Sequence, residues 1–168
     1  DAGAVALNLA VGALSNPATT TEAAAYAYDE GMVIVGAAGD ENAYHHNFPA
    51  VLDNSVYVHS IRHNTPDDDD DVYSYMNTWN CNNYGARMTL VAPSGACATG
   101  ACAVTTGVVG LLQSAARNLG LRLSAGEVVQ LMIQTVDDVF LEPDELATSR
   151  AYPSKEGWDA FFGYGRVN

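Results

Sequence analysis

Residues 94–112 read SGACATGACAVTTGVVGLL, and this stretch decides which fold the sequence predicts. It begins with glycine and other small residues and continues as an apolar run with helical spacing. That pattern predicts a tight loop leading into a core helix over residues 99–118. The mouth of such a helix is a common position for a catalytic nucleophile, and the residue delivered there is Thr99 rather than a serine.

Four segments predict β-strands, and the first two predict burial on both faces. These two are short, nearly continuous apolar runs, whereas the fourth segment is halted by Pro93. Such runs are typical of strands in a parallel sheet. The four segments are residues 4–12, 32–39, 55–61 and 87–93.

Helical patterns lie between and after these strands. Residues 21–30 predict a short helix with Thr21 as its cap. Residues 123–136 predict another, which starts with the capping-box pair Ser124 and Glu127. Because strands alternate with helices, the sequence predicts an α/β fold with a mainly parallel β-sheet flanked by helices.

The first predicted strand raises a difficulty, because no earlier strand precedes it to pair with its edge. An apolar edge strand left uncovered invites aggregation. We therefore expect this edge to be covered, either by sequence preceding Asp1 or by another protein chain.

The composition excludes some classes of partner. The 168 residues include 20 Asp and Glu but only 7 Lys and Arg, which gives a formal net charge of −13. Such a surface repels phosphate backbones, so we expect no nucleic-acid binding. The apolar stretches are shorter than the roughly 20 residues that a membrane span needs, so we also expect no such span.

Six segments, taken in chain order, carry a resemblance to a known family. They resemble the C-terminal half of a subtilisin-like serine protease, and they read ALNLAVG, GMVIVGAAGDE, NFPA with SVYVHSI, NNYGARMTLVAPSG, CATGACAVTTGVVGLL, and SAGEVVQLMIQT with the terminal GYGRVN. The resemblance implies a subtilisin-like fold whose N-terminal part of the sheet is missing from this chain. Residues 1–168 would then be the C-terminal portion of one such domain. It also implies that the aspartate and histidine of the family's catalytic triad lie in the missing half.

The resemblance places Thr99 at the nucleophile position. Gly107 and Leu111 match the glycine and leucine of the family's helix motif, and counting back from them aligns Thr99 with the serine. A threonine hydroxyl could attack, but its extra methyl restricts the rotamer and crowds the approach. The alternative is a structural role as a helix cap or first-turn hydroxyl.

The resemblance also aligns Asp40 with the residue that stabilises the oxyanion, which is usually an asparagine. An amide donates a hydrogen bond to developing negative charge, whereas a carboxylate at neutral pH only accepts one. Losing one such donor typically costs on the order of 10²–10³ in rate. Together, Asp40 and Thr99 predict a degenerate active site.

The substrate-binding scaffold departs less from the family pattern. Small residues with open backbone predict pairing with an extended peptide along one segment and the lining of a specificity pocket along another. The candidate residues are Ala10, Val11 and Gly12 for the first and Gly36, Ala37, Ala38 and Gly39 for the second. The alternative is that they serve only core and turn packing.

Two hypotheses of function follow. The first is a catalytically degenerate pseudoprotease with a structural or peptide-binding role in a larger chain or assembly. The alternative is an active endopeptidase, in which the missing half supplies aspartate and histidine and Thr99 attacks. The sequence alone leaves both open.

The remaining charged and histidine residues predict no built metal site or cofactor. We expect His45, His46, His59 and His63 to be surface or packing residues, because no further ligand spacing accompanies them. The aspartate run 67–71 could hold calcium, but contiguous aspartates cannot all face one ion. We expect this run to be a solvated loop.

The three cysteines predict at most one disulfide. In the fold that the chain resembles, Cys81 and Cys97 fall in loops near the active site, so they could pair. Cys102 lies in the predicted helix and is expected to be a buried apolar residue. A disulfide would favour an extracytoplasmic or secreted location.

Overall fold

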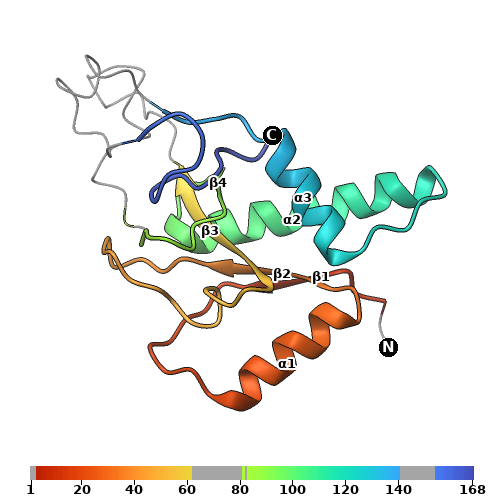
Figure 1. The fold of residues 1–168 in the computed structure, drawn as a ribbon, viewed down its shortest axis with the longest axis horizontal. Coiled ribbons are helices and arrows are strands. Elements are labelled where there is room, and N and C mark those ends of the chain that lie inside the picture. Colours follow the sequence, from red (N-terminus) through yellow and green to blue (C-terminus); the bar gives the residue numbers. More distant parts are fainter. Residues whose placement is uncertain (1–2, 62–80, 82, 141–153) are drawn as a thin grey trace.

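The computed structural model describes residues 3–61, 81, 83–140 and 154–168. Its centre is a four-stranded parallel sheet in the order β1-β2-β3-β4 (Figure 1). The strands are β1 (Ala6–Leu9), β2 (Val33–Ala37), β3 (Ser55–Ile61) and β4 (Leu90–Pro93). The predicted α/β class and parallel sheet are confirmed.

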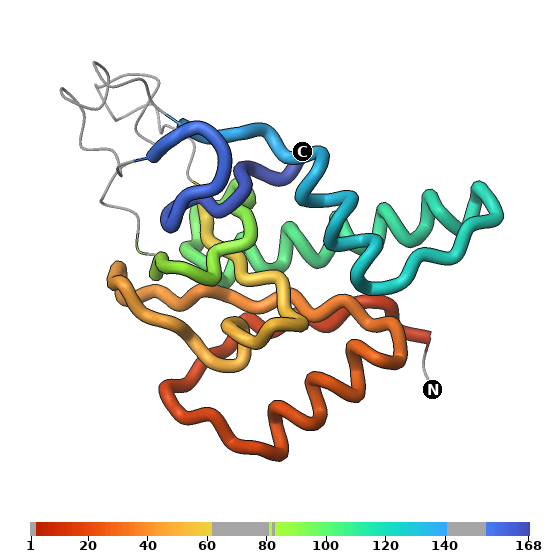
Figure 2. Tube along the Cα trace, in the orientation of Figure 1, coloured from red at the N-terminus to blue at the C-terminus, as the bar shows by residue number. Residues whose placement is uncertain are grey.

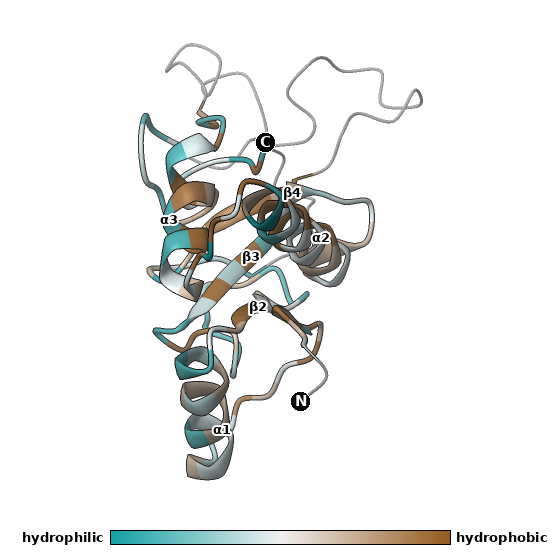
Figure 3. Cartoon of the chain, turned by 90° about the vertical axis from the view of Figure 1, so that its right-hand side faces the viewer, coloured by the Kyte–Doolittle hydropathy of each residue, from teal (hydrophilic) through white to brown (hydrophobic). Residues whose placement is uncertain are grey.

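The helices cover both faces of this sheet. Figure 3 shows α1 and α3 on one face of the sheet and α2 on the other. The Cα trace in Figure 2 lets the reader follow the chain from one element to the next. The helices are α1 (Ala18–Asp29), α2 (Cys97–Asn118) and α3 (Ala125–Thr135). Covering both faces explains why the inner strands read as continuous apolar runs.

The core lies around β2, β3 and the first three residues of β4. All five residues of β2 are buried, as are six of the seven in β3. His59 of β3 is fully buried and packs edge-to-face on Phe162, with ring centroids 6.2 Å apart. Burial lowers the pKa of His59 to about 3, so its imidazole is neutral at physiological pH. The prediction of a packing histidine is confirmed at this position.

The first strand differs from its prediction. β1 is shorter than the predicted 4–12, and its residues are half-buried or, at Asn8, exposed. Among the residues that the structure describes, it forms the edge of the sheet and pairs with β2 alone. The continuous apolar run therefore predicted more burial than β1 has. The sequence pattern does not show whether a second strand lies beside β1.

The opposite edge of the sheet is lined by the C-terminal tail. The backbone N–H groups of Tyr164 and Val167 donate to Thr89 O at 2.9 Å and Val91 O at 2.8 Å, and Val91 N–H donates to Gly165 O at 2.9 Å. Gly163 has φ +62°, and a Cβ there would overlap the backbone of Thr89. The GYG sequence thus allows the tail to approach β4 closely.

Helix starts were predicted with mixed success. The capping box of α3 is confirmed: Glu127 N–H donates to Ser124 Oγ at 3.3 Å, and Ser124 N–H donates to the Glu127 carboxylate at 2.8 Å. Thr21 is not the cap of α1, because that helix starts three residues earlier, after Pro17, and makes no side-chain cap bond. Thr21 instead donates to Asn16 Oδ1 at 2.8 Å.

Helix α2 starts at Cys97, two residues before the predicted position. By length and composition it could cross a membrane, and it is the one helix among the described residues of which this is true. However, core helices of soluble proteins pass the same test. α2 packs against all four strands of the sheet, as such a helix does.

Candidate active site

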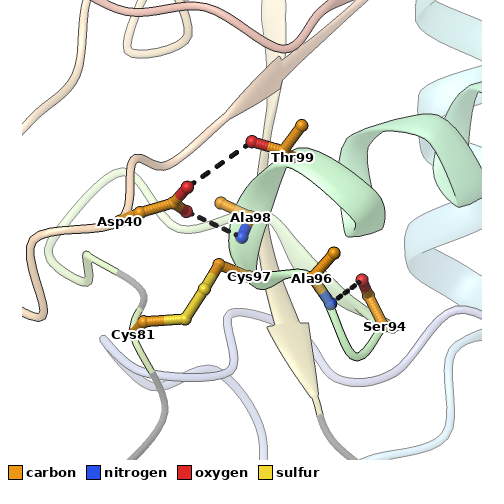
Figure 4. Close-up of a disulfide and its surroundings, with 7 residues drawn as sticks. All are labelled: Asp40, Cys81, Ser94, Ala96, Cys97, Ala98 and Thr99. Atoms are coloured by element: carbon orange, nitrogen blue, oxygen red, sulfur yellow. Dashed lines mark hydrogen bonds between the residues drawn. A yellow bond between two sulfur atoms is a disulfide. The ribbon is translucent and has the colours of Figure 1, made fainter.

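The candidate site forms where two strands end at the same edge of the sheet. Asp40 follows the end of β2 by three residues, and the loop before α2 follows β4. The carboxyl ends of parallel strands meet at one edge, which is where ligands bind in open α/β sheets. The fold therefore brings Asp40 and Thr99 together, although 59 residues separate them (Figure 4).

Asp40 interacts with the start of α2 through its carboxylate. The Ala98 N–H donates to Asp40 Oδ1 at 3.0 Å, and the Thr99 hydroxyl lies 3.5 Å from Asp40 Oδ2 in a long hydrogen bond. A carboxylate is favourable at a helix N-terminus because it accepts from free N–H groups at the positive end of the helix dipole. Asp40 thus acts as an N-terminal cap supplied from a distant segment.

The Asp40 carboxylate is engaged with the start of α2 and acts as a hydrogen-bond acceptor there. The family resemblance expects an amide donor at position 40, whereas the Asp40 carboxylate accepts a hydrogen bond from Ala98 N–H. Thr99 is exposed in the first turn of α2. Within the described residues, no hydrogen bond joins Thr99 to a histidine.

The loop before α2, residues 94–96, and the first residues of the helix have a tightly determined shape. Ser94 Oγ accepts from Ala96 N–H at 3.0 Å, and a Cβ at Gly100 would overlap the Ser94 hydroxyl. Cys97 has φ +41°, a left-handed conformation that is uncommon for a non-glycine residue. We call residues 94–100 the elbow.

The elbow is also cross-linked. Cys81 and Cys97 form a disulfide with their Cα atoms 5.6 Å apart, and Cys102 is a buried free thiol (Figure 4). Both expectations for the cysteines are confirmed. The disulfide joins the start of α2 to the segment that contains Asn83.

The predicted specificity-pocket residues Gly36, Ala37, Ala38 and Gly39 are held closely by their neighbours. Ala37 and Ala38 are buried, and a Cβ at Gly36 would overlap Ala50. Gly39 has φ +97°, and a Cβ there would lie 2.5 Å from Asn83 Nδ2 and 2.8 Å from Glu41 Oε2. Packing at Gly36 and backbone geometry at Gly39 thus require glycine at these two positions.

The predicted peptide-pairing residues Ala10, Val11 and Gly12 are more accessible. Val11 is 63% exposed, Gly12 is exposed and Ala10 is half-buried. A Cβ at Gly12 would overlap the side chain of Asn47, so that side chain lies directly against this segment.

Asn47 is a site residue that the sequence reasoning missed. It is buried, its Nδ2 donates to Ala37 O at 3.0 Å, and its Cγ would lie 3.5 Å from a Cβ at Gly39. The side chain therefore occupies space between the two predicted peptide-contacting segments. No sequence signal distinguished it from other loop asparagines.

A second missed cluster contains Asn83, Glu41 and His45. The fully buried Asn83 donates to Ala38 O at 3.0 Å and to the Glu41 carboxylate, and lies 3.1 Å from His45 Nε2. This Asn83 hydrogen bond is the largest cause of a lowered Glu41 pKa. Glu41 and His45 also form an ion-pair contact at 3.3 Å when the imidazole is charged. The cluster fixes the loop that carries Asp40.

The described parts of the chain contain no candidate metal site. No three or more His, Cys, Asp or Glu side chains in them are arranged so that they could hold an ion. His63 and the aspartate run 67–71 lie outside the described residues. His46 is exposed and His45 half-buried.

The solved structures that share this fold include proteases. The chain aligns with the prenylagaramide maturation protease PagA at 16% identity and TM-score 0.74, covering 99% of this chain and 60% of that one. It aligns with the patellamide maturation protease PatA at 19% identity and TM-score 0.72, covering 99% and 61%. Sphericase gives 15% identity and TM-score 0.67, covering 97% and 56%. At these identities the likeness shows the fold.

The chain spans between 49% and 61% of the length of the matched structures. No functionally curated protein matches it significantly. The model of the Subtilase family matches residues 1–165. That match covers nearly the whole chain, and the parallel sheet and elbow agree with it, so this chain belongs to the subtilase family.

Proposed function

We propose that residues 1–168 form the C-terminal portion of a subtilisin-like domain that binds peptide or protein ligands without efficient cleavage. The domain would work within a larger chain or assembly. The observation that carries the proposal is the Asp40 carboxylate, which accepts from Ala98 N–H at 3.0 Å. A group that caps the helix in this way cannot at the same time donate to an oxyanion.

Peptide binding is supported by the exposure of Val11 and Gly12, which follow the half-buried Ala10. An extended peptide can add to such a segment through main-chain hydrogen bonds, with side-chain pockets supplying specificity. The Asn47 side chain lies directly against Gly12, so we expect small ligand side chains to be favoured beside this residue.

A partner that completes the sheet is also part of the proposal. β1 is an edge strand, and the outward face of α2 beside it includes Val104 and Leu111, which are 42% and 72% exposed. α2 has a single charged residue, Arg117. An uncharged helix face next to an open strand edge fits a covering protein layer, supplied by an N-terminal half of the domain or by another chain.

The alternative function is an active endopeptidase. It is favoured by the exposure of Thr99 in the first turn of α2, since the family resemblance aligns this residue with the nucleophile. A general base and its orienting carboxylate would have to come from outside the described residues.

Fluorophosphonate labelling of the intact protein separates the two functions. We expect no labelling of the wild type, and the same result for Thr99→Ala. Thr106→Ala, on the same helix but beyond the elbow, is the matched control. Labelling of the wild type and of Thr106→Ala that disappears in Thr99→Ala would overturn the proposal in favour of the protease.

Peptide binding is tested separately by fluorescence anisotropy with extended peptides. Asn47→Gly should open the space beside Gly12 and raise affinity for peptides with a bulky apolar side chain by about tenfold. Affinity for peptides that carry alanine in place of this bulky side chain should hardly change. Equal effects on both peptides, or no binding by either protein, would contradict the proposed subsite.

An extracytoplasmic location is proposed as well. It is supported by the Cys81–Cys97 disulfide, since such bonds persist in oxidising compartments and are rare in the cytosol. Thiol alkylation of freshly lysed cells should find Cys81 and Cys97 blocked. Their complete alkylation before reduction would contradict this location.

A further inference from the structure

We propose that the Cys81–Cys97 disulfide is a reversible clasp that sets the conformation of the elbow, so that the candidate site responds to thiol reductants. The link to the site rests on the proposed function. The conformational part does not, and the experiment below separates them.

The disulfide joins two segments that both bind the loop after β2. On one side, Asn83 N–H donates to Gly39 O at 3.0 Å. On the other side, Ala98 N–H donates to Asp40 Oδ1 at 3.0 Å. The disulfide adds the third connection, so the three segments position one another around Asp40.

The conformation at Cys97 needs such support. This residue is the first of α2 and has φ +41°, which persists in a non-glycine residue only when its surroundings impose it. The preceding Ala96 offers no side-chain cap. The disulfide and the Asp40 carboxylate therefore hold this helix start together with the hydrogen bond from Ala96 N–H to Ser94 Oγ.

The remaining cysteine does not compete for the bond. Cys102 is buried, and its thiol donates to Asn8 Oδ1 at 2.8 Å and Val35 O at 3.2 Å. Burial raises the pKa of Cys102 to about 11, so little of it is the reactive thiolate at neutral pH. After reduction, Cys81 and Cys97 can therefore re-form their original pair.

Reduction has a defined chemistry and consequence. Cys81 and Cys97 are both partly exposed, so a dithiol reductant can reach them. It transfers two electrons and two protons, the S–S bond breaks into two thiols, and the reductant becomes a disulfide. Cys97 is then free to leave the left-handed region, which weakens the contact between Ala98 N–H and Asp40.

Amide hydrogen exchange on the intact protein tests the clasp. We expect dithiothreitol to speed exchange at residues 98–100 by about tenfold and to leave α3 unchanged. Re-oxidation should restore the original rates. Cys102→Ala should behave as the wild type, because its thiol takes no part.

A matched pair of variants tests the role of the left-handed residue without a reductant. Cys81→Ser/Cys97→Ala should exchange as fast at residues 98–100 as the reduced wild type. Cys81→Ser/Cys97→Gly should be slower, because glycine adopts a positive φ at little cost. Unchanged exchange on reduction, equal loosening of α3, or equal rates in the two variants would each overturn the clasp.

The functional arm uses the anisotropy assay with the same samples. Peptide affinity that falls on reduction together with faster exchange supports the clasp as a control of the site. Faster exchange with unchanged affinity supports the conformational clasp and overturns its link to the site. If neither the oxidised nor the reduced protein binds peptide, the proposed function is overturned. Hydrogen exchange alone then tests whether the disulfide sets the conformation of the elbow.

Discussion

Two helix starts in this molecule are built in opposite ways. α3 begins with a capping box in which both partners, Ser124 and Glu127, lie three residues apart. α2 begins without a side-chain cap of its own and accepts one from Asp40, 58 residues earlier in the chain. The first start is a local property of the sequence, and the second exists only after the sheet has formed.

The difference shows where the local sequence does not by itself determine the structure. A helix stabilised by its own residues needs no left-handed cysteine and no cross-link. The start of α2 has both, at the edge of the sheet where the family has its nucleophile. Locally unfavourable geometry that the tertiary structure imposes is typical of functional sites.

Among the changes that separate the two helix starts, removing the disulfide at α2 should lower the free energy of unfolding most. Cys81→Ser/Cys97→Ser opens a loop with a sequence separation of 16, which should lower the free energy of unfolding by about 3 kcal/mol. Urea unfolding followed by circular dichroism measures the change. Reduced wild type is the control, and it should match the variant. A loss below about 1 kcal/mol would mean that the bond constrains little.

Two glycines of α2 should respond oppositely to alanine. At Gly100 a Cβ would overlap the Ser94 hydroxyl, so Gly100→Ala should destabilise the fold by about 2 kcal/mol. At Gly107 a Cβ meets nothing within 4 Å, so Gly107→Ala should stabilise it by up to about 1 kcal/mol.

Thermal unfolding of both glycine variants checks this pair. Ser94→Gly in the Gly100→Ala background should recover part of the loss, because it removes the side chain that clashes. Equal effects of alanine at the two positions would show that the elbow adapts more easily than its geometry indicates.

Removing each cap compares the two starts directly. Asp40→Ala and Ser124→Ala should each lower stability by about 1 kcal/mol, the usual effect of losing an N-terminal cap. Asp40→Asn should lose less, since its amide oxygen can still accept from Ala98 N–H. Local hydrogen exchange should show the Asp40 effect at residues 98–100 and the Ser124 effect at the start of α3. Loosening of both helices by one substitution would mean that the caps are not independent.

Acid should produce the smallest and most local change. Hydrogen bonds from Ser124 lower the pKa of Glu127 below its ordinary value. A carboxyl whose pKa is lower in the folded state stabilises that state above the ordinary pKa of about 4.3. The contribution is lost as pH falls through the lowered value. Glu127→Gln should remove this pH dependence at the start of α3, as measured by exchange between pH 5 and 3. An unaltered profile would contradict it.

Much of the fold could be predicted because its signals are local. The buried runs of β2 and β3 and the Ser124–Glu127 capping box are each encoded within a few neighbouring residues. The half-exposed β1 was not predictable, because burial depends on a neighbouring strand rather than on apolarity. Pro17 replaced Thr21 as the start of α1, so a hydroxyl near a helix start is a weak signal by itself.

The candidate site was predictable only in part, for the same reason. Register within a resembling motif located Thr99 and Asp40, but not the hydrogen bond that joins Asp40 to Ala98. Asn47 and Asn83 escaped prediction because their roles come from packing between loops. Their contacts span 10 to 45 positions along the chain.

The two edges of the sheet also limit how copies of this chain could associate. The tail bonds to Thr89 and Val91 beside β4, whereas β1 pairs with β2 alone among the described residues. A strand that adds to β1 therefore finds no equivalent free edge beside β4. If a second copy of this chain were to take the place of the covering layer, pairing through β1 would be isologous and would end at a dimer rather than grow into a fibre.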